Sequence, residues 1–176
     1  MNTVKKLSVA LILITAASQV ASDDHSKLLA DALSAAPVSL RDKVTVMDWN
    51  NNVLQEGSSG YTCFPTPPTL QGTAPMCLDG PWQKWAEAWM NKQPHTPAKF
   101  GVSYMLAGDD GASNIDPYAE GKTDDNQWVK EGPHIMIIVP DPALLNALPM
   151  DPHNGGPYVM WKGTEYAHIM VQVSLE

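Results

Sequence analysis

Two short segments near the end of the chain repeat the tripeptide His-Ile-Met, at residues 134–136 and 168–170. Each tripeptide lies in a run rich in Ile and Val, which is typical of a β-strand. Because side chains of a strand alternate between its two faces, each His shares a face with the Met two residues later, about 7 Å away. Imidazole and thioether groups together suit copper, and thioethers favour Cu(I). If the two strands are neighbours in a suitable register, the candidate metal ligands are His134, Met136, His168 and Met170.

The same four residues also have a purely structural interpretation. Met136 and Met170 can pack under a helix, while His134 and His168 make hydrogen bonds. The His-x-Met spacing is similar to that of periplasmic copper chaperones, but this similarity covers one tripeptide and extends neither to their motif order nor to their scaffold. The choice between a metal site and a structural role depends on whether the four side chains converge in space.

A second group of candidate ligands lies in the acidic loop at residues 108–125. Oxygen-rich loops bind Ca²⁺, but the ligand spacing of an EF-hand and its final Glu are absent here. Asn114 and Asp116 are typical of turns, in which their side chains bond to nearby backbone groups. The carboxylate and amide side chains of the loop are Asp109, Asp110, Asn114, Asp116, Glu120, Asp124 and Asp125.

A hydrolytic site is a third hypothesis. The chain has no G-x-S-x-G motif, and a Ser-His-Asp arrangement is recognised only by its geometry. Asp141 and Asp151 could do acid–base chemistry with His153, but both aspartates precede Pro, where caps and turns are expected. The candidate nucleophiles are Ser59, Ser103 and Ser113, and the candidate bases are His134, His153 and His168.

The first residues have the organisation of an export signal. Lys5 and Lys6 precede an apolar segment at residues 7–17, and small residues follow it. We expect residues 1–21 to form a signal peptide cleaved between residues 17 and 22, and the protein to be periplasmic or secreted. Residues 22–176, about 155 residues, suit a single domain. No later segment approaches the ~20 apolar residues of a spanning helix, so we expect no membrane span after cleavage.

The charge of the chain excludes nucleic acid as an expected partner. The formal net charge is -8, from 11 basic and 19 acidic residues. Loss of Lys5 and Lys6 with the signal lowers it by 2 more, and no basic cluster offsets the acidic surface. Such a surface repels phosphates, which leaves a metal ion or a small molecule as the expected partner class.

The two cysteines, Cys63 and Cys77, predict a disulfide in an oxidising compartment. The bond closes a loop of about 15 residues and stabilises the fold by about 3 kcal/mol on the chain-entropy model. The chain has no C-x-x-C motif, so we expect a structural role rather than a redox role.

The elements that must position these residues have an α+β pattern. Apolar spacing predicts a helix over residues 24–36, which Pro37 ends, and another over residues 81–91. The second helix carries Trp82, Trp85 and Trp89 on one stripe, which we expect to pack against a sheet. Asp141 caps a short helix over residues 142–148. Strands are expected at residues 43–49, 53–56, 57–64, 102–107, 135–139, 158–161 and 166–173. Together these predict a mostly antiparallel sheet of about five to seven strands with two or three helices.

Several stretches of the chain resemble an uncharacterised family of exported bacterial proteins. They are MDWNNNVLQEGSSGYTCFPTPP, PMCLDGPWQKWAEAWM, GVSYMLAGDDGASNIDP, GPHIMIIVPDP and GGPYVMWKGTEYAHIMV, and they cover most of the mature chain. The resemblance implies export and a single-domain organisation. It implies no activity, cofactor or catalytic residue.

The function favoured by the residues is a small binding module, with a candidate copper or other metal site on the two His-x-Met strands. One alternative is a hydrolase-like enzyme acting on a small molecule of the periplasm. Another is a structural or partner-binding protein with an exposed Trp or Met patch.

Overall fold

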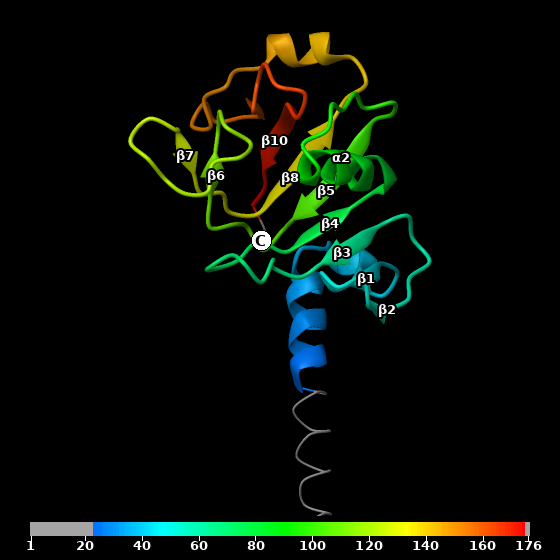
Figure 1. Cartoon of the computed structure of the whole chain (residues 1–176). Coiled ribbons are helices and arrows are strands. Elements are labelled where there is room, and N and C mark those ends of the chain that lie inside the picture. The colour runs from blue at the N-terminus through cyan, green and yellow to red at the C-terminus, as the bar shows by residue number, and fades with distance from the viewer. Residues whose placement is uncertain (1–22, 175–176) are drawn as a thin grey trace, which may run out of the picture.

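A computed structural model describes residues 23–174 and has the α+β architecture expected from the sequence (Figure 1). Residues 23–34 are helical, and the 3-10 helix η1 follows at Val38–Leu40. The predicted signal peptide lies outside the described residues. The other helices are α2 (Gly80–Met90) and the 3-10 helix η2 (Pro142–Ala147). The strands are β1 (Thr45–Met47), β2 (Val53–Gln55), β3 (Thr62–Phe64), β4 (Met76–Leu78), β5 (Gly101–Met105), β6 (Ala112–Ser113), β7 (Trp128–Val129), β8 (His134–Ile138), β9 (Tyr158–Met160) and β10 (His168–Gln172).

The main sheet has the strand order β2-β1-β3-β4-β5-β8-β10-β9. All of its pairs are antiparallel except β1 with β3, which is parallel. The expected five to seven strands are therefore too few, since this sheet has eight. The strand missing from the sequence prediction is Met76–Leu78, which is too short to show an alternating pattern between Pro75 and Asp79.

Helix α2 covers one face of this sheet. Asp79 caps the helix by accepting a hydrogen bond from the backbone N–H of Trp82, and Pro81 lies in the first turn. Trp82 and Trp85 are buried against Ile138 and Met170 of the sheet, as the stripe predicts. Trp89 is half-buried in the same cluster. The tryptophans are therefore core, and they do not form an exposed patch.

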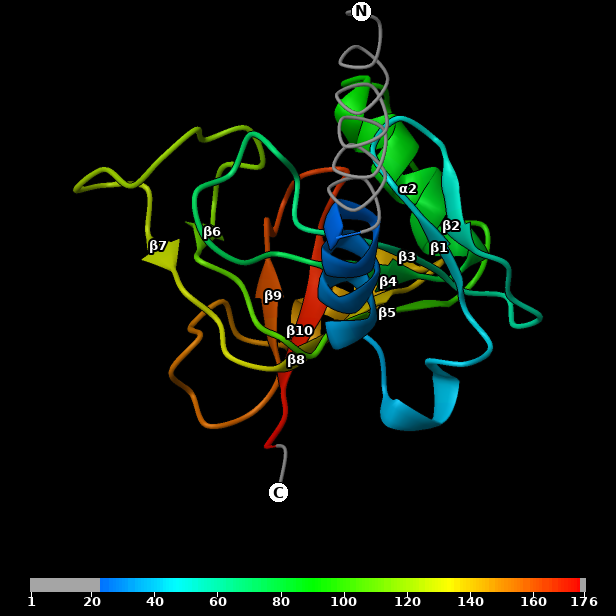
Figure 2. The same ribbon diagram turned by 90° about the horizontal axis from the view of Figure 1, so that it is seen from below.

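The C-terminal part of the helical residues 23–34 packs on the opposite face. Ala32 packs there against Val46, Cys63 and Cys77, each with no exposed surface. Cys63 and Cys77 are direct partners across β3 and β4 and form the predicted disulfide. In Figure 1 the blue helix lies at the lower end of the molecule, well away from α2, and Figure 2 shows the same helix end-on.

The end of the sheet that carries β9 is closed by loops and by the small sheet of β6 and β7 (Figure 1). Backbone N–H groups of Val159 and Trp161 donate to the carbonyls of Pro149 and Asn114. The η2 helix packs Leu145 against Val159 on the outer face. Within residues 23–174, no helix is long and apolar enough to cross a membrane.

Candidate functional site

The register of β8 and β10 decides how the two His-x-Met segments meet. Met136 lies directly opposite Met170, whereas His134 lies opposite Gln172. His168 pairs with Met160 on the next strand, β9. All four predicted ligands are on the face that α2 covers, as alternation requires. The structure thus places the two methionines side by side, while the backbone positions of the two histidines are four residues apart along the strands, about 13 Å.

Both histidines are held in the same way by the backbone. The Nδ1 atom of His134 is 2.8 Å from the carbonyl oxygen of Gly132, and that of His168 is 2.9 Å from the carbonyl oxygen of Tyr166. A carbonyl only accepts, so Nδ1 carries the hydrogen in each ring and Nε2 presents a lone pair in the neutral form. A backbone carbonyl on the other ring nitrogen is the usual way to orient a metal-binding His.

His168 lies in an aromatic environment. Its ring meets those of Trp82, Trp85 and Trp161 edge-to-face, with centroid separations of 5.4, 5.5 and 5.1 Å. Burial lowers the pKa of His168 to about 4, although the Tyr166 carbonyl partly opposes this shift. The imidazole is therefore neutral at pH 7 and is packed as part of the core.

His134 lies in a polar environment instead. The Nε2 atom of its fully buried ring has no hydrogen-bond partner among residues 23–174. The carboxylate of Asp109 lies beside the ring, with its Oδ2 atom 3.9 Å from Nε2. Met105 lies directly opposite His134 on β5. A buried polar atom without a partner is costly, which marks this nitrogen as a candidate binding atom.

Asp109 reaches this position through a tight approach between two loops. Gly108 has a φ of 75°, and a Cβ at this residue would lie 2.7 Å from the carbonyl oxygen of Glu131. The Oδ1 atom of Asp109 accepts hydrogen bonds from the backbone N–H groups of Gly111 and Glu131, at 2.8 and 3.3 Å. These bonds fix the carboxylate and leave Oδ2 facing His134. Burial raises the pKa of Asp109, while His134 and these backbone bonds act in the opposite direction.

Glu131 belongs to the same group of side chains as His134 and Asp109, and it is 3% exposed. Its Oε1 accepts a hydrogen bond of 2.6 Å from the Tyr158 hydroxyl, and its Oε2 accepts one of 2.8 Å from Gln172 Nε2. Burial raises the pKa of Tyr158, and its hydrogen bond to Glu131 adds to the shift. Sequence reasoning missed Glu131, Tyr158 and Gln172, because their association depends on strand order. The available signal was a glutamate three residues before the apolar strand β8.

Two candidate residues of the hydrolytic hypothesis, Ser103 and His134, lie near each other in the sheet. Ser103 lies on the same face as His134, and its buried hydroxyl has no partner among the described residues. Nε2 of His134 also has no partner there, so the serine and the histidine are not hydrogen-bonded to each other. Asp141 and Asp151 accept hydrogen bonds from the backbone N–H groups of Ala143 and His153, and thus serve as the expected cap and turn.

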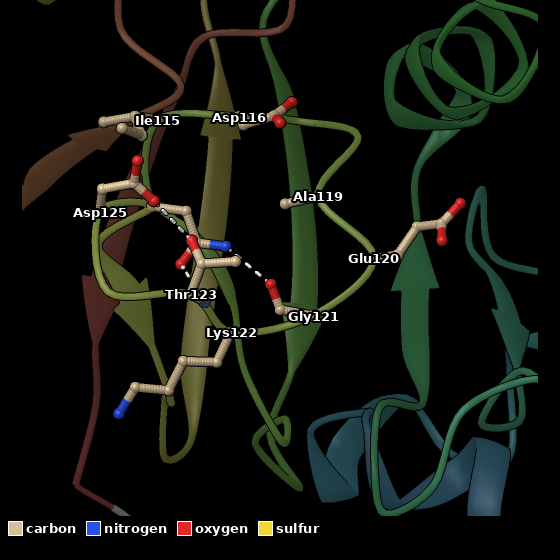
Figure 3. A pocket seen from close by; sticks show the side chains of 9 residues that line it. Ile115, Asp116, Ala119, Glu120, Gly121, Lys122, Thr123 and Asp125 are labelled. Carbon is tan, nitrogen blue, oxygen red and sulfur yellow. Dashed lines mark hydrogen bonds between the residues drawn. The ribbon is translucent and has the colours of Figure 1, made fainter.

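The acidic loop surrounds an open concavity of about 620 Å³, which Figure 3 shows from close by. The charged ends of Asp116, Glu120 and Lys122 point away from one another in this view. Asp116 bonds to the backbone N–H of Tyr118, and Asp125 accepts from the Thr123 hydroxyl. Asp116 and Asp125 therefore serve the turns of the loop, and in the described part of the chain no three carboxylates of the loop lie close enough to hold a metal ion.

Within residues 23–174, no three His, Cys, Asp or Glu side chains lie close enough to hold a metal ion together. A metal at His134 could then have at most one further ligand of these four types, and its remaining ligands would be thioethers or water. No protein-family model matches the chain, and no curated protein or solved structure matches it either. The chemistry of the site is thus the only guide to function.

Proposed function

We propose that the protein is an exported binding module that holds a metal ion at His134, on the same face of the sheet as α2. The observation that carries this proposal is the Nε2 atom of His134, which is buried and lacks a hydrogen-bond partner in the described part of the chain. The ring is oriented by the Gly132 carbonyl, so that Nε2 is the free ligand atom.

The neighbouring side chains supply further donors. Met105 is opposite His134 on β5, and Met170 is diagonal to it across β10. Thioethers bind Cu(I) and imidazole binds both copper states and zinc. The ring of His168 packs against three tryptophans, so its part in the predicted four-residue site would be to support the core around Met170.

A periplasmic or secreted location is part of this proposal. The disulfide between Cys63 and Cys77 is consistent with an oxidising compartment, as is the export signal predicted at residues 1–21.

Metal titration of protein purified after export, and stripped with a chelator, tests the proposal. We expect one ion per chain to bind with micromolar affinity or tighter. His134→Asn should weaken binding by more than about tenfold, because the amide can still donate to Gly132 but offers no Nε2 ligand. The matched control is His153→Asn, at an exposed histidine whose loss should leave the affinity unchanged.

A second measurement covers the case in which His134→Asn does not fold. In wild-type protein labelled with ¹⁵N, added metal should shift the Nε2 resonance of His134 and leave that of His153 in place. Absence of binding, or a shift confined to exposed histidines, would contradict the proposed metal-binding function.

A further inference from the structure

We infer that Asp109 completes the site and makes it selective for a divalent ion of the Zn²⁺ or Cu²⁺ class over Cu(I). This inference rests on the metal-binding function proposed above and goes beyond it, because it changes both the ligand set and the metal. The His-x-Met motif alone offers only neutral donors, which suit a monovalent soft ion. The juxtaposition of Asp109 with His134 adds an anionic oxygen donor.

The distance between the two candidate ligand atoms suits a bridging ion. Nε2 of His134 and Oδ2 of Asp109 are 3.9 Å apart. Tetrahedral zinc, with bonds of about 2.1 Å to imidazole nitrogen and carboxylate oxygen, holds the two atoms about 3.4 Å apart, so one ion can bond to both after they approach by about 0.5 Å. A direct hydrogen bond would need a much shorter separation than the one observed.

The two ligands are oriented before any ion arrives. The Gly132 carbonyl fixes the imidazole, and two backbone N–H groups occupy Oδ1 of Asp109. Oδ2 has no hydrogen bond of its own among residues 23–174, and its side chain is 15% exposed. This small exposure of Asp109 gives an ion a route from solvent to Nε2 of His134, which is itself buried.

The charge of the cluster also favours a divalent cation. Asp109 and Glu131 are both acidic, and His134 lies beside Asp109. Lys130, which precedes Glu131 in the sequence, pairs instead with Asp110. Glu131 is engaged by Tyr158 and Gln172, which are uncharged donors. An ion of charge two would offset this buried acidity better than an ion of charge one.

Parallel titrations with Zn²⁺, Cu²⁺ and Cu(I) test the inference. We expect wild-type protein to bind the divalent ions more tightly than Cu(I). Asp109→Asn should weaken divalent binding by more than about tenfold and change Cu(I) binding by less than about threefold. Asp110→Asn is the matched control, since its carboxylate pairs with Lys130 outside the cluster, and we expect it to leave both affinities unchanged.

The outcomes separate this inference from the function on which it rests. If wild-type protein binds no metal, the proposed function fails. If it binds Cu(I) but no divalent ion, or if Asp109→Asn keeps full divalent affinity, the function stands and the role of Asp109 is overturned. If Asp109→Asn does not fold, infrared spectra of wild-type protein decide instead. Zn²⁺ must then shift a carboxylate stretching band, and an unchanged spectrum overturns the inference.

Discussion

At the scale of single residues, two identical tripeptides have different roles because their surroundings differ. His168 packs edge-on against three tryptophans, and burial keeps its ring neutral. His134 instead faces Asp109 with an unpartnered nitrogen. The sequence predicted the shared motif and the common face of its side chains. It did not predict that the two histidines have different surroundings, because Asp109 comes from a loop 25 residues earlier in the chain than His134.

The hydrogen bond between Tyr158 and Glu131 gives a prediction at this scale. Tyr158→Phe removes the hydroxyl that contacts Oε1 of a buried carboxylate and leaves this oxygen without its donor. We expect the free energy of unfolding to fall by about 1–3 kcal/mol. Urea denaturation followed by tryptophan fluorescence measures the change. Tyr118→Phe, at a partly exposed tyrosine, should have a much smaller effect. Equal losses in the two variants would contradict a special role for the buried pair.

At the scale of elements, the disulfide ties two short strands beneath the helical residues 23–34. Cys63 and Cys77 are cross-strand partners, and the Sγ of Cys77 lies 4.0 Å from the carbonyl oxygen of Ala32. Three-residue strands such as β3 and β4 have few ladder bonds, so their pairing depends on this cross-link and on the helix above it.

Replacement of both cysteines tests this dependence. The double variant Cys63→Ala, Cys77→Ala should lose about 3 kcal/mol of unfolding free energy, because the unfolded chain regains the freedom of the closed loop. Urea denaturation with and without a reductant measures the loss. Since both cysteines are fully buried, we also expect wild-type protein to resist reduction until it is denatured. A loss below about 1 kcal/mol, or rapid reduction of the native protein, would contradict this account.

The elements with a clear pattern were predictable from the sequence, and the shortest ones were not. The Asp79 cap, the proline at the start of α2 and the tryptophan stripe specify that helix in one stretch of sequence. Alternation likewise specifies β8 and β10, and Gly163 marks the turn region between β9 and β10. By contrast, β6 and β7 have two residues each, which is too few for any periodicity to appear.

At the scale of the whole molecule, the site depends on contacts between distant segments. The sheet order places β5 beside β8, and Gly108 lets the loop after β5 approach the backbone of Glu131. Local patterns carry no information on such an approach. This is why the sequence could predict the α+β class and the disulfide, but not the register that separates His134 from His168.

Locating a metal in the folded protein is the most direct test of the site at His134 and Asp109. Crystals grown with Zn²⁺ should give one anomalous scattering peak at the zinc edge, within bonding distance of Nε2 of His134 and Oδ2 of Asp109. A peak only at an exposed residue such as His153, or no peak in the cluster at saturating zinc, would contradict the assignment of this buried pair as a metal site.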